Sequence, residues 1–315
     1  MTLPTRRHLV LGAGALVTLT ACGSPDPGPG ADTASSGASG ADPPSGTLTI
    51  SAIPDQDPEK LNRLYPALAA YLSQAAGVQV EYVPVTDYPA VVRAFEIGDV
   101  QMSWMGGLTG VQARSRVEGA NAVAQRDIDA DFHSLFIAST SSGLAPFTEV
   151  DGLTALAGHS LTFGSETSTS GRLMPQYFMG QAGLDLSQLA GQPGFSGSHD
   201  ATIEAVASGS FEVGAVNEQV WTANEESGAI DTTDVDVLWR TPGYADYHWL
   251  ARPDIDEQLG DGVSAKVVEA ILALDAADPT QAEILDLFGA ESFVPAENAD
   301  YDQIEQVAGE LGLLA

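Results

Sequence analysis

The strongest constraint on the fold is an alternation of strand-like and helix-like segments that begins at residue 47. Apolar alternation predicts strands at 47–53, 78–85 and 100–104, and apolar residues on one helical face predict helices at 59–76 and 88–97. A strand–helix–strand–helix–strand order is typical of a mostly parallel sheet flanked by helices. We therefore predict an α/β fold.

The same alternation continues along the chain and ends in a helical tail. Further strands are predicted at 120–125, 132–139, 160–164, 212–216 and 235–239, and further helices at 111–116, 177–182, 200–207, 218–224, 263–274, 280–288 and 301–311. Two polar segments, Thr140–Gly143 and 240–249, are interpreted as crossings between two lobes. The expected first lobe is 47–141 with 243–315, and the expected second lobe is 142–242.

A short polar segment follows the strand predicted at 160–164. Four hydroxyl-bearing residues form what we call the cradle: Thr167, Ser168, Thr169 and Ser170. Because Pro175 fits only the first turn of a helix, the helix should begin near Ser170, with free N–H groups at the positive end of its dipole. The cradle could therefore bind a tetrahedral oxyanion without a lysine. An ordinary capped helix start is the alternative, although one hydroxyl would suffice for that.

The N-terminus indicates an exported, anchored protein. An apolar run from Leu9 to Leu19 follows Arg6-Arg7 and ends in Leu19-Thr20-Ala21-Cys22, which resembles a bacterial lipoprotein cleavage box. The run is too short for a spanning helix, so we interpret 1–21 as a signal peptide. Cys22, the one cysteine, is the expected lipidation site, and 22–46 is the expected tether. Export through the general secretory route and through the twin-arginine route both remain open.

The composition is strongly acidic, with 43 Asp and Glu against 12 Lys and Arg and a formal net charge of −31. Such a surface disfavours nucleic acid and anionic membrane surfaces as partners. A solvated, salt-adapted surface accounts for the charge itself. An anionic ligand would have to be attracted by local dipoles, so its site should be enclosed.

Five motifs occur in the same order in the phosphate-, phosphite- and phosphonate-binding family of ABC-transporter solute-binding proteins. They are Thr86-Asp87-Tyr88, Trp104-Met105-Gly106-Gly107, the cradle, Gly197-Ser198-His199-Asp200 and Asn217-Glu218. The chain resembles this family from Thr47 to Leu313. Ser51–Gln56 and Phe195–Asp200 are most similar to a subgroup named as selenate-binding. The resemblance implies a two-lobed periplasmic-binding-protein fold of type II that closes over a ligand in the cleft between its lobes.

The resemblance also implies which residues contact the anion. They are Tyr88, the cradle residues Thr167, Ser168, Thr169 and Ser170, His199 and Glu218. The family often has an aromatic residue in the turn after the third strand, where this chain has Leu108 or Thr109, and we include Thr109. Tyr247 is added because its hydroxyl can donate to an anion. The expected partners are an ABC permease and ATPase, with the protein acting as an extracytoplasmic monomer anchored by its lipid, without cofactor or catalysis.

Two other kinds of site are disfavoured by spacing. The five histidines are scattered without the spacing of metal ligands, so we expect no metal site. A hydrolase built on Ser168, His199 and Asp200 is the alternative of another class. No Gly-x-Ser-x-Gly turn precedes these residues, and helix neighbours such as His199 and Asp200 do not face each other.

Ligand identity depends on whether a carboxylate faces the site. Phosphite, phosphate and phosphonates can keep a proton that a carboxylate accepts, whereas sulfate and selenate are fully deprotonated near neutral pH. If Glu218 faces the ligand, a protonated phosphorus oxyanion is favoured. The subgroup resemblance favours selenate instead, and both ligands remain open at this point.

Overall fold

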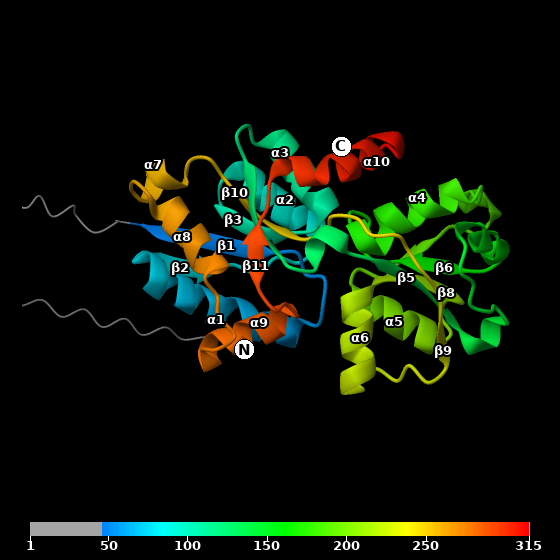
Figure 1. Ribbon diagram of the computed structural model, residues 1–315. Coiled ribbons are helices and arrows are strands. Elements are labelled where there is room, and N and C mark those ends of the chain that lie inside the picture. Colours follow the sequence, from blue (N-terminus) through cyan, green and yellow to red (C-terminus); the bar gives the residue numbers. More distant parts are fainter. Residues whose placement is uncertain (1–45, 315) are drawn as a thin grey trace, which may run out of the picture. The chain divides into compact units, whose positions relative to one another are not determined.

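Two mixed sheets form the centre of the computed structural model, which describes residues 46–314 (Figure 1). These residues belong to one compact unit. The predicted signal peptide, Cys22 and the tether up to residue 45 lie outside the described residues.

The first sheet has six strands in the order β11-β4-β10-β3-β1-β2. Its strands are β1 (Thr47–Ala52), β2 (Gln79–Tyr82), β3 (Met102–Met105), β4 (Asn121–Arg126), β10 (His248–Ala251) and β11 (Phe293–Pro295). β1 pairs in parallel with β2 and β3, whereas β10 is antiparallel to β3 and β4, and β11 is antiparallel to β4. β1 to β4 therefore run in one direction, as the sequence predicts for a mostly parallel sheet.

The second sheet has five strands in the order β7-β6-β8-β5-β9. Its strands are β5 (Ser134–Ser139), β6 (Leu161–Phe163), β7 (Gly194–Phe195), β8 (Val213–Asn217) and β9 (Val235–Arg240). β6 pairs in parallel with β7 and β8, and β5 is antiparallel to both β8 and β9.

The sheet that holds β5 differs from the sequence prediction. The strand at 132–139 was expected in the first lobe, but β5 pairs with β8 and β9 of the second sheet. The chain therefore crosses between sheets before Ser134, and the Thr140–Gly143 turn lies within the second sheet's connections. Local sequence could not reveal this, because an apolar strand fits either sheet equally well. The return crossing follows β9, inside the predicted segment 240–249, although β10 already begins at His248.

Helices cover the sheets, and apolar periodicity predicts all of the described α-helices except α7 (Figure 1). Those of the first sheet are α1 (Pro58–Ala76), α2 (Tyr88–Ile97), α3 (Gly107–Arg116), α7 (Ile255–Leu259), α8 (Val263–Leu272), α9 (Pro279–Phe288) and α10 (Asp302–Glu310). Those of the second sheet are α4 (Met174–Gln181), α5 (His199–Ala207) and α6 (Glu218–Ser227). The C-terminal helices contact the first sheet's helices, α8 and α9 against α1 and α10 against α3, as predicted for the tail.

Helix starts are fixed by side-chain caps at the carboxyl ends of the strands. Asp87 accepts a hydrogen bond from the Ala90 N–H at the start of α2, and Asn217 accepts one from the Val220 N–H at the start of α6. α3 begins at Gly107, earlier than the predicted residue 111, because Gly106 has the extended backbone of an N-cap. In open α/β sheets, ligands bind outside these carboxyl ends. The caps therefore position the turns in which the candidate residues lie.

Candidate functional site

Two hydrogen bonds join the turns after the strands of the first sheet to those of the second, and a third joins a turn of the first sheet to the return crossing. The Leu108 N–H donates to Oγ1 of Thr169 at 2.9 Å, and the His199 N–H donates to the Asp55 carbonyl at 3.0 Å. The Gly107 N–H donates to Oδ1 of Asp246, in the return crossing, at 3.0 Å. The candidate site is therefore built from both sheets and the crossing between them.

The cradle lies where the sequence predicts it, between β6 and α4. Oγ of Ser168 accepts a hydrogen bond from the Gly171 N–H at 2.9 Å and caps a π-helical turn, Thr169–Leu173, that precedes α4. Pro175 lies in the first turn of α4, as expected. Ser168, Thr169 and Ser170 are buried. Burial of three hydroxyls at a helix start is more than capping requires, since Ser168 alone supplies the cap.

Three hydroxyls of this region have no hydrogen-bond partner in the structure although they are buried. They belong to Thr167, Ser170 and Tyr88. Leaving a buried polar group unsatisfied costs about 1–3 kcal/mol, so native sites rarely keep several of them together without a function. Tyr88 is near Ser168, whose hydroxyl opposes the rise in the Tyr88 pKa that burial causes. These hydroxyls can donate to the oxygens of an anion.

Gly171 allows the ring of His199 to approach the cradle closely. A Cβ atom on Gly171 would lie 2.9 Å from Ser168 Oγ and 3.1 Å from His199 Cε1. His199 is fully buried, and burial lowers the pKa of its imidazole to about 3. Its Nδ1 accepts from the Asn217 N–H at 3.3 Å, so the proton of the neutral ring lies on Nε2. His199 is therefore a neutral donor rather than a cation.

Tyr247 closes the site from the return crossing. Its hydroxyl accepts from Nδ2 of Asn217 at 2.9 Å and lies 3.4 Å from Nε2 of His199. Its ring is stacked on Trp104, with 5.7 Å between centroids and 17° between planes. The predicted candidates Tyr88, His199, Tyr247 and the cradle are thus brought together.

Asp246 is a buried carboxylate that the sequence reasoning did not select. One oxygen accepts the Gly107 N–H, and the other, Oδ2, has no partner in the structure. Burial raises the pKa of the Asp246 carboxyl to about 7. The Gly107 N–H and the hydroxyls of Thr169 and Ser170 lower this pKa, but by less than burial raises it. Near neutral pH this group can therefore either hold a proton or accept one.

Asp55 is a second buried carboxylate, in the loop after β1. It is 1% exposed, and neither of its oxygens has a hydrogen-bond partner in the structure. Burial raises its pKa, opposed by the Tyr247 hydroxyl and by the charges of Lys60 and Arg126. The sequence signal for Asp55 is its position in the turn after the carboxyl end of β1.

Two predicted residues are oriented differently from the others. Glu218 is bound through both carboxylate oxygens to Arg240, at 2.6 and 2.8 Å, and its side chain is 34% exposed. It therefore faces Arg240 and solvent, not the unpartnered hydroxyls. Thr109 is buried, but its hydroxyl donates to the Gly106 carbonyl at 3.0 Å within the first turn of α3. The hydroxyl proton of Thr109 is therefore already in a hydrogen bond within the helix.

A buried cation, Arg126, lies at the end of β4. It forms an ion pair with Asp129 at 2.7 Å, and its guanidinium lies 4.8 Å from the centroid of the Tyr247 ring. Because Asp129 balances its charge, Arg126 organises the aromatic wall of the site more than it supplies free positive charge.

The residues of the alternative hydrolase do not form a triad. Oδ1 of Asp200 accepts from Nδ2 of Asn224 at 2.8 Å, while Nδ1 of His199 faces a backbone N–H. Ser168 Oγ accepts from Gly171. No carboxylate thus orients His199 as a base toward Ser168. Among residues 46–314, no group of three or more His, Cys, Asp or Glu side chains has the arrangement of a metal site.

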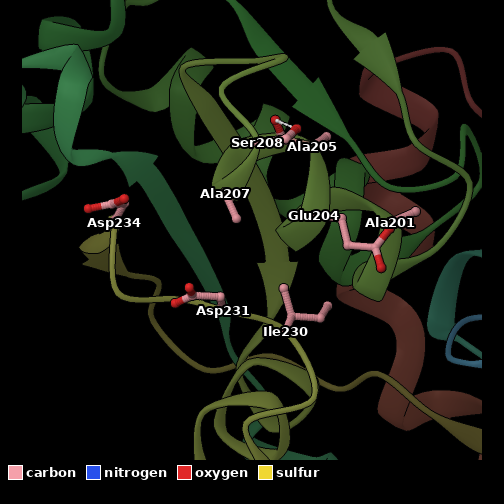
Figure 2. A pocket seen from close by; sticks show the side chains of 8 residues that line it. All are labelled: Ala201, Glu204, Ala205, Ala207, Ser208, Ile230, Asp231 and Asp234. Atoms are coloured by element: carbon pink, nitrogen blue, oxygen red, sulfur yellow. Dashed lines mark hydrogen bonds between the residues drawn. The ribbon is translucent and has the colours of Figure 1, made fainter.

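A groove of about 640 Å³ lies elsewhere on the second sheet (Figure 2). It is lined by Ala201, Glu204, Ala205, Ala207 and Ser208 of α5 and by Ile230, Asp231 and Asp234 of the loop before β9. Three carboxylates face this groove and none of the predicted site residues does, so it is a poor place for an anion.

Comparison with known proteins identifies the family. A family model described as the periplasmic substrate-binding protein of a phosphonate ABC transporter matches residues 50–301. The chain belongs to this family. It is 42% identical over 265 residues to the "Probable ABC transporter phosphite binding protein PhnD1" of Prochlorococcus marinus (strain MIT 9301), covering 84% of this chain and 89% of that protein. It is 26% identical to the "Phosphate-import protein PhnD" of Mycolicibacterium smegmatis, covering 84% and 86%.

Solved structures of the family agree with the fold. PhnD1 of Prochlorococcus marinus in complex with methylphosphonate matches with a TM-score of 0.83 at 41% identity, covering 85% of this chain and 98% of that chain. The aliphatic sulphonate-binding protein SsuA of Escherichia coli, at 16% identity and a TM-score of 0.55, shares the fold alone. The protein is thus a periplasmic-type substrate-binding component of an ABC transporter, with the predicted α/β architecture. Within residues 46–314, no helix has the length and apolarity needed to cross a membrane.

Proposed function

We propose that the protein binds a small tetrahedral phosphorus oxyanion, of the phosphite or phosphonate kind, for import by an ABC transporter. The observation that carries this proposal is that the unpartnered buried hydroxyls of Ser170 and Tyr88 lie near Asp246, whose Oδ2 is also buried and unpartnered. Hydroxyls of Thr167, Ser170 and Tyr88 would donate to the ligand oxygens. Asp246 would accept a proton from a P–OH group.

The carboxylate decides between ligand classes. An ionised Asp246 repels a fully deprotonated anion, but it forms a short, charge-assisted hydrogen bond with a ligand that keeps one proton. Because the Asp246 pKa lies near 7, ligand and carboxylate can share one proton around neutral pH. Asp246 thus takes the role that the sequence analysis gave to Glu218. Selenate or sulfate remains the second candidate, and it would require Asp246 to be protonated.

His199 and the helix starts complete the donor set. The Nε2–H of neutral His199 and the N-terminus of α3, which begins at Gly107, can oppose the charge of the ligand without a cation. The relatives support this choice of ligand: one is named for phosphite, one for phosphate, and one was solved with methylphosphonate.

Ligand capture would use closure of two lobes around the site. The sheets favour one lobe boundary between β4 and β5, in place of the expected 141/142, and a second between β9 and β10, where the expected 242/243 lies. The two hydrogen bonds between Leu108 and Thr169 and between His199 and Asp55 would form on closure and break on opening.

Location and partners follow from the family together with the N-terminal sequence. We propose cleavage after residue 21, lipidation of Cys22, a tether over 22–46 and attachment to the outer face of the cell membrane. The monomeric, closed protein would deliver its ligand to a permease and ATPase. It would act by binding alone, without catalysis or a cofactor.

A calorimetric panel tests the proposed ligand. Phosphite, methylphosphonate, phosphate, sulfate and selenate are titrated into the purified chain across pH 5 to 8. We expect phosphite or methylphosphonate to bind most tightly at neutral pH, and selenate to weaken as pH rises because Asp246 loses its proton. Tight selenate binding that is independent of pH would overturn the proposal.

A further inference from the structure

Lys60 is one of two lysines in the chain, and it lies beside the site. It belongs to the first turn of α1, which follows the loop that carries Asp55. Its ammonium donates to Oε1 of Gln56, a neutral amide, at 2.6 Å, and its side chain is half-buried. Lys60 is therefore held in place by a group that does not neutralise its charge.

Two carboxylates from different sheets lie in the field of this ammonium. One is Asp55, buried and without a hydrogen-bond partner on either oxygen. The other is Asp200, in the first turn of α5, whose Oδ2 is also buried and without a partner. The His199 N–H donates to the Asp55 carbonyl at 3.0 Å, which holds the start of α5 against the Asp55 loop.

The surroundings of Lys60 both raise and lower the pKa of its ammonium. Burial lowers the pKa of the Lys60 ammonium, Asp55 and Asp200 raise it, and Arg126 and Arg63 lower it. Arg126 is already paired with Asp129 at 2.7 Å. Arg63 is exposed, so Lys60 is the half-buried cation that acts on both Asp55 and Asp200.

We propose that Lys60 is a positioning residue that balances Asp55 in the first lobe and Asp200 in the second, and so lets the closed site hold an anion. This inference rests on the proposed function. Bringing an anion to buried carboxylates in a chain with 43 acidic residues is electrostatically unfavourable. An ammonium whose charge acts on both carboxylates lowers that cost, and its attraction to Asp200 favours closure.

The second lysine provides a matched control. Lys266 lies exposed on α8, and Lys266→Gln changes the net charge by the same amount as Lys60→Gln. We expect Lys60→Gln to weaken methylphosphonate and phosphite binding by about tenfold or more at low ionic strength, and Lys266→Gln by about twofold or less. Lys60→Arg should largely restore binding. An equal loss in both glutamine variants would show that only net charge matters and would overturn the proposal.

The link between lobes is tested by a double-mutant cycle. If Lys60 attracts Asp200 in the closed protein, Asp200→Asn and Lys60→Gln should affect affinity non-additively. The double variant should then bind more tightly than the product of the single losses predicts. Additive losses would contradict the interlobe role.

A ligand-free measurement separates this inference from the proposed function. Reductive ¹³C-methylation labels just two lysines, so the Lys60 resonance can be assigned with Lys60→Gln and titrated by NMR. Asp55→Asn should lower the Lys60 pKa without added ligand and should leave the Lys266 resonance unaffected. Asp200→Asn should lower the Lys60 pKa when methylphosphonate or phosphite is bound. An unchanged Lys60 titration in Asp55→Asn would overturn the role of Lys60 whatever the ligand. Absence of binding by all phosphorus ligands, with the Asp55→Asn shift present, would count against the proposed function instead.

Discussion

The Leu108 N–H, at the start of α3, donates to Oγ1 of Thr169, in the π-helical turn before α4, at 2.9 Å. This bond links the cradle of the second sheet directly to a helix N-terminus of the first. If the lobes close as proposed, Thr169 supports the closed state and also lines the proposed ligand site.

Replacing Thr169 by Val should weaken the closed state. The variant keeps the shape of the side chain but removes the acceptor, so the Leu108 N–H loses its partner, at a cost of about 1–3 kcal/mol in affinity. Thr169→Ser is the control and should bind nearly as the natural protein does. Calorimetry measures the affinity, and small-angle scattering should show a smaller compaction on ligand addition for Thr169→Val. Equal compaction and affinity would show that this bond does not support closure.

Removing an unpartnered hydroxyl should weaken binding without weakening the fold. Ser170→Ala and Tyr88→Phe each remove a buried donor that has no protein partner, so each should cost about 1–3 kcal/mol of affinity while thermal stability is unchanged or raised. Ser168→Ala is different, because Ser168 also caps the turn at Gly171, and it should lower stability too. Unchanged affinity in the Ser170→Ala, Tyr88→Phe double variant would place the ligand elsewhere.

Asp246→Asn and Glu218→Gln compare the two carboxylates. Asn cannot accept a P–OH proton as a charged group, so Asp246→Asn should weaken phosphite binding by about 2–3 kcal/mol and improve selenate relative to phosphite. Glu218→Gln breaks a half-exposed pair with Arg240, and such pairs contribute about 0–1 kcal/mol. Competition titrations with phosphite and selenate give the ratio of the two affinities directly. The opposite pattern would return the proton-accepting role to Glu218.

The sequence predicted most of the strands and helices, because these depend on local patterns. It did not predict β7, β10, β11 or α7, and it placed the start of α3 at residue 111 instead of Gly107. Asp87 and Asn217 cap their helices, and the cradle hydroxyls precede α4, as their residue types predict. Strand partners are long-range, so the placement of β5 in the second sheet was not predictable from local pattern.

Local sequence also could not predict the direction in which side chains at the candidate site point. Glu218 follows the strand at the expected position, but Arg240 at the end of β9 attracts it outward. Asp246 is adjacent to Tyr247 in a polar segment and gives no periodic signal. Only the fold shows that it reaches the N–H of Gly107.

Lipid anchoring is tested by Cys22→Ser. If Cys22 carries the lipid, the variant should be released from the membrane fraction and should bind methylphosphonate as the natural protein does, because the site lies within 46–314. Fractionation in high salt followed by immunoblotting measures the release. Persistent membrane association of the variant would mean that another segment holds the protein.

The raised pKa of Asp246 should appear in the stability of the unliganded protein. A carboxyl whose pKa is raised to about 7 in the folded state, from 3.8, binds its proton more tightly folded than unfolded. Its contribution to the free energy of unfolding is therefore present below about pH 4 and is lost as pH rises to about 7, by on the order of a few kcal/mol. Asp246→Asn should remove this part of the pH dependence, and urea unfolding from pH 4 to 8 measures it. Glu218→Gln, which changes a half-exposed group, is the control and should keep the natural slope. Added phosphite should flatten the pH dependence of the free energy of unfolding in the natural protein, because Asp246 then accepts a hydrogen bond from the ligand's proton. If Asp246→Asn and the natural protein show the same pH dependence, this carboxyl is already ionised in the folded chain.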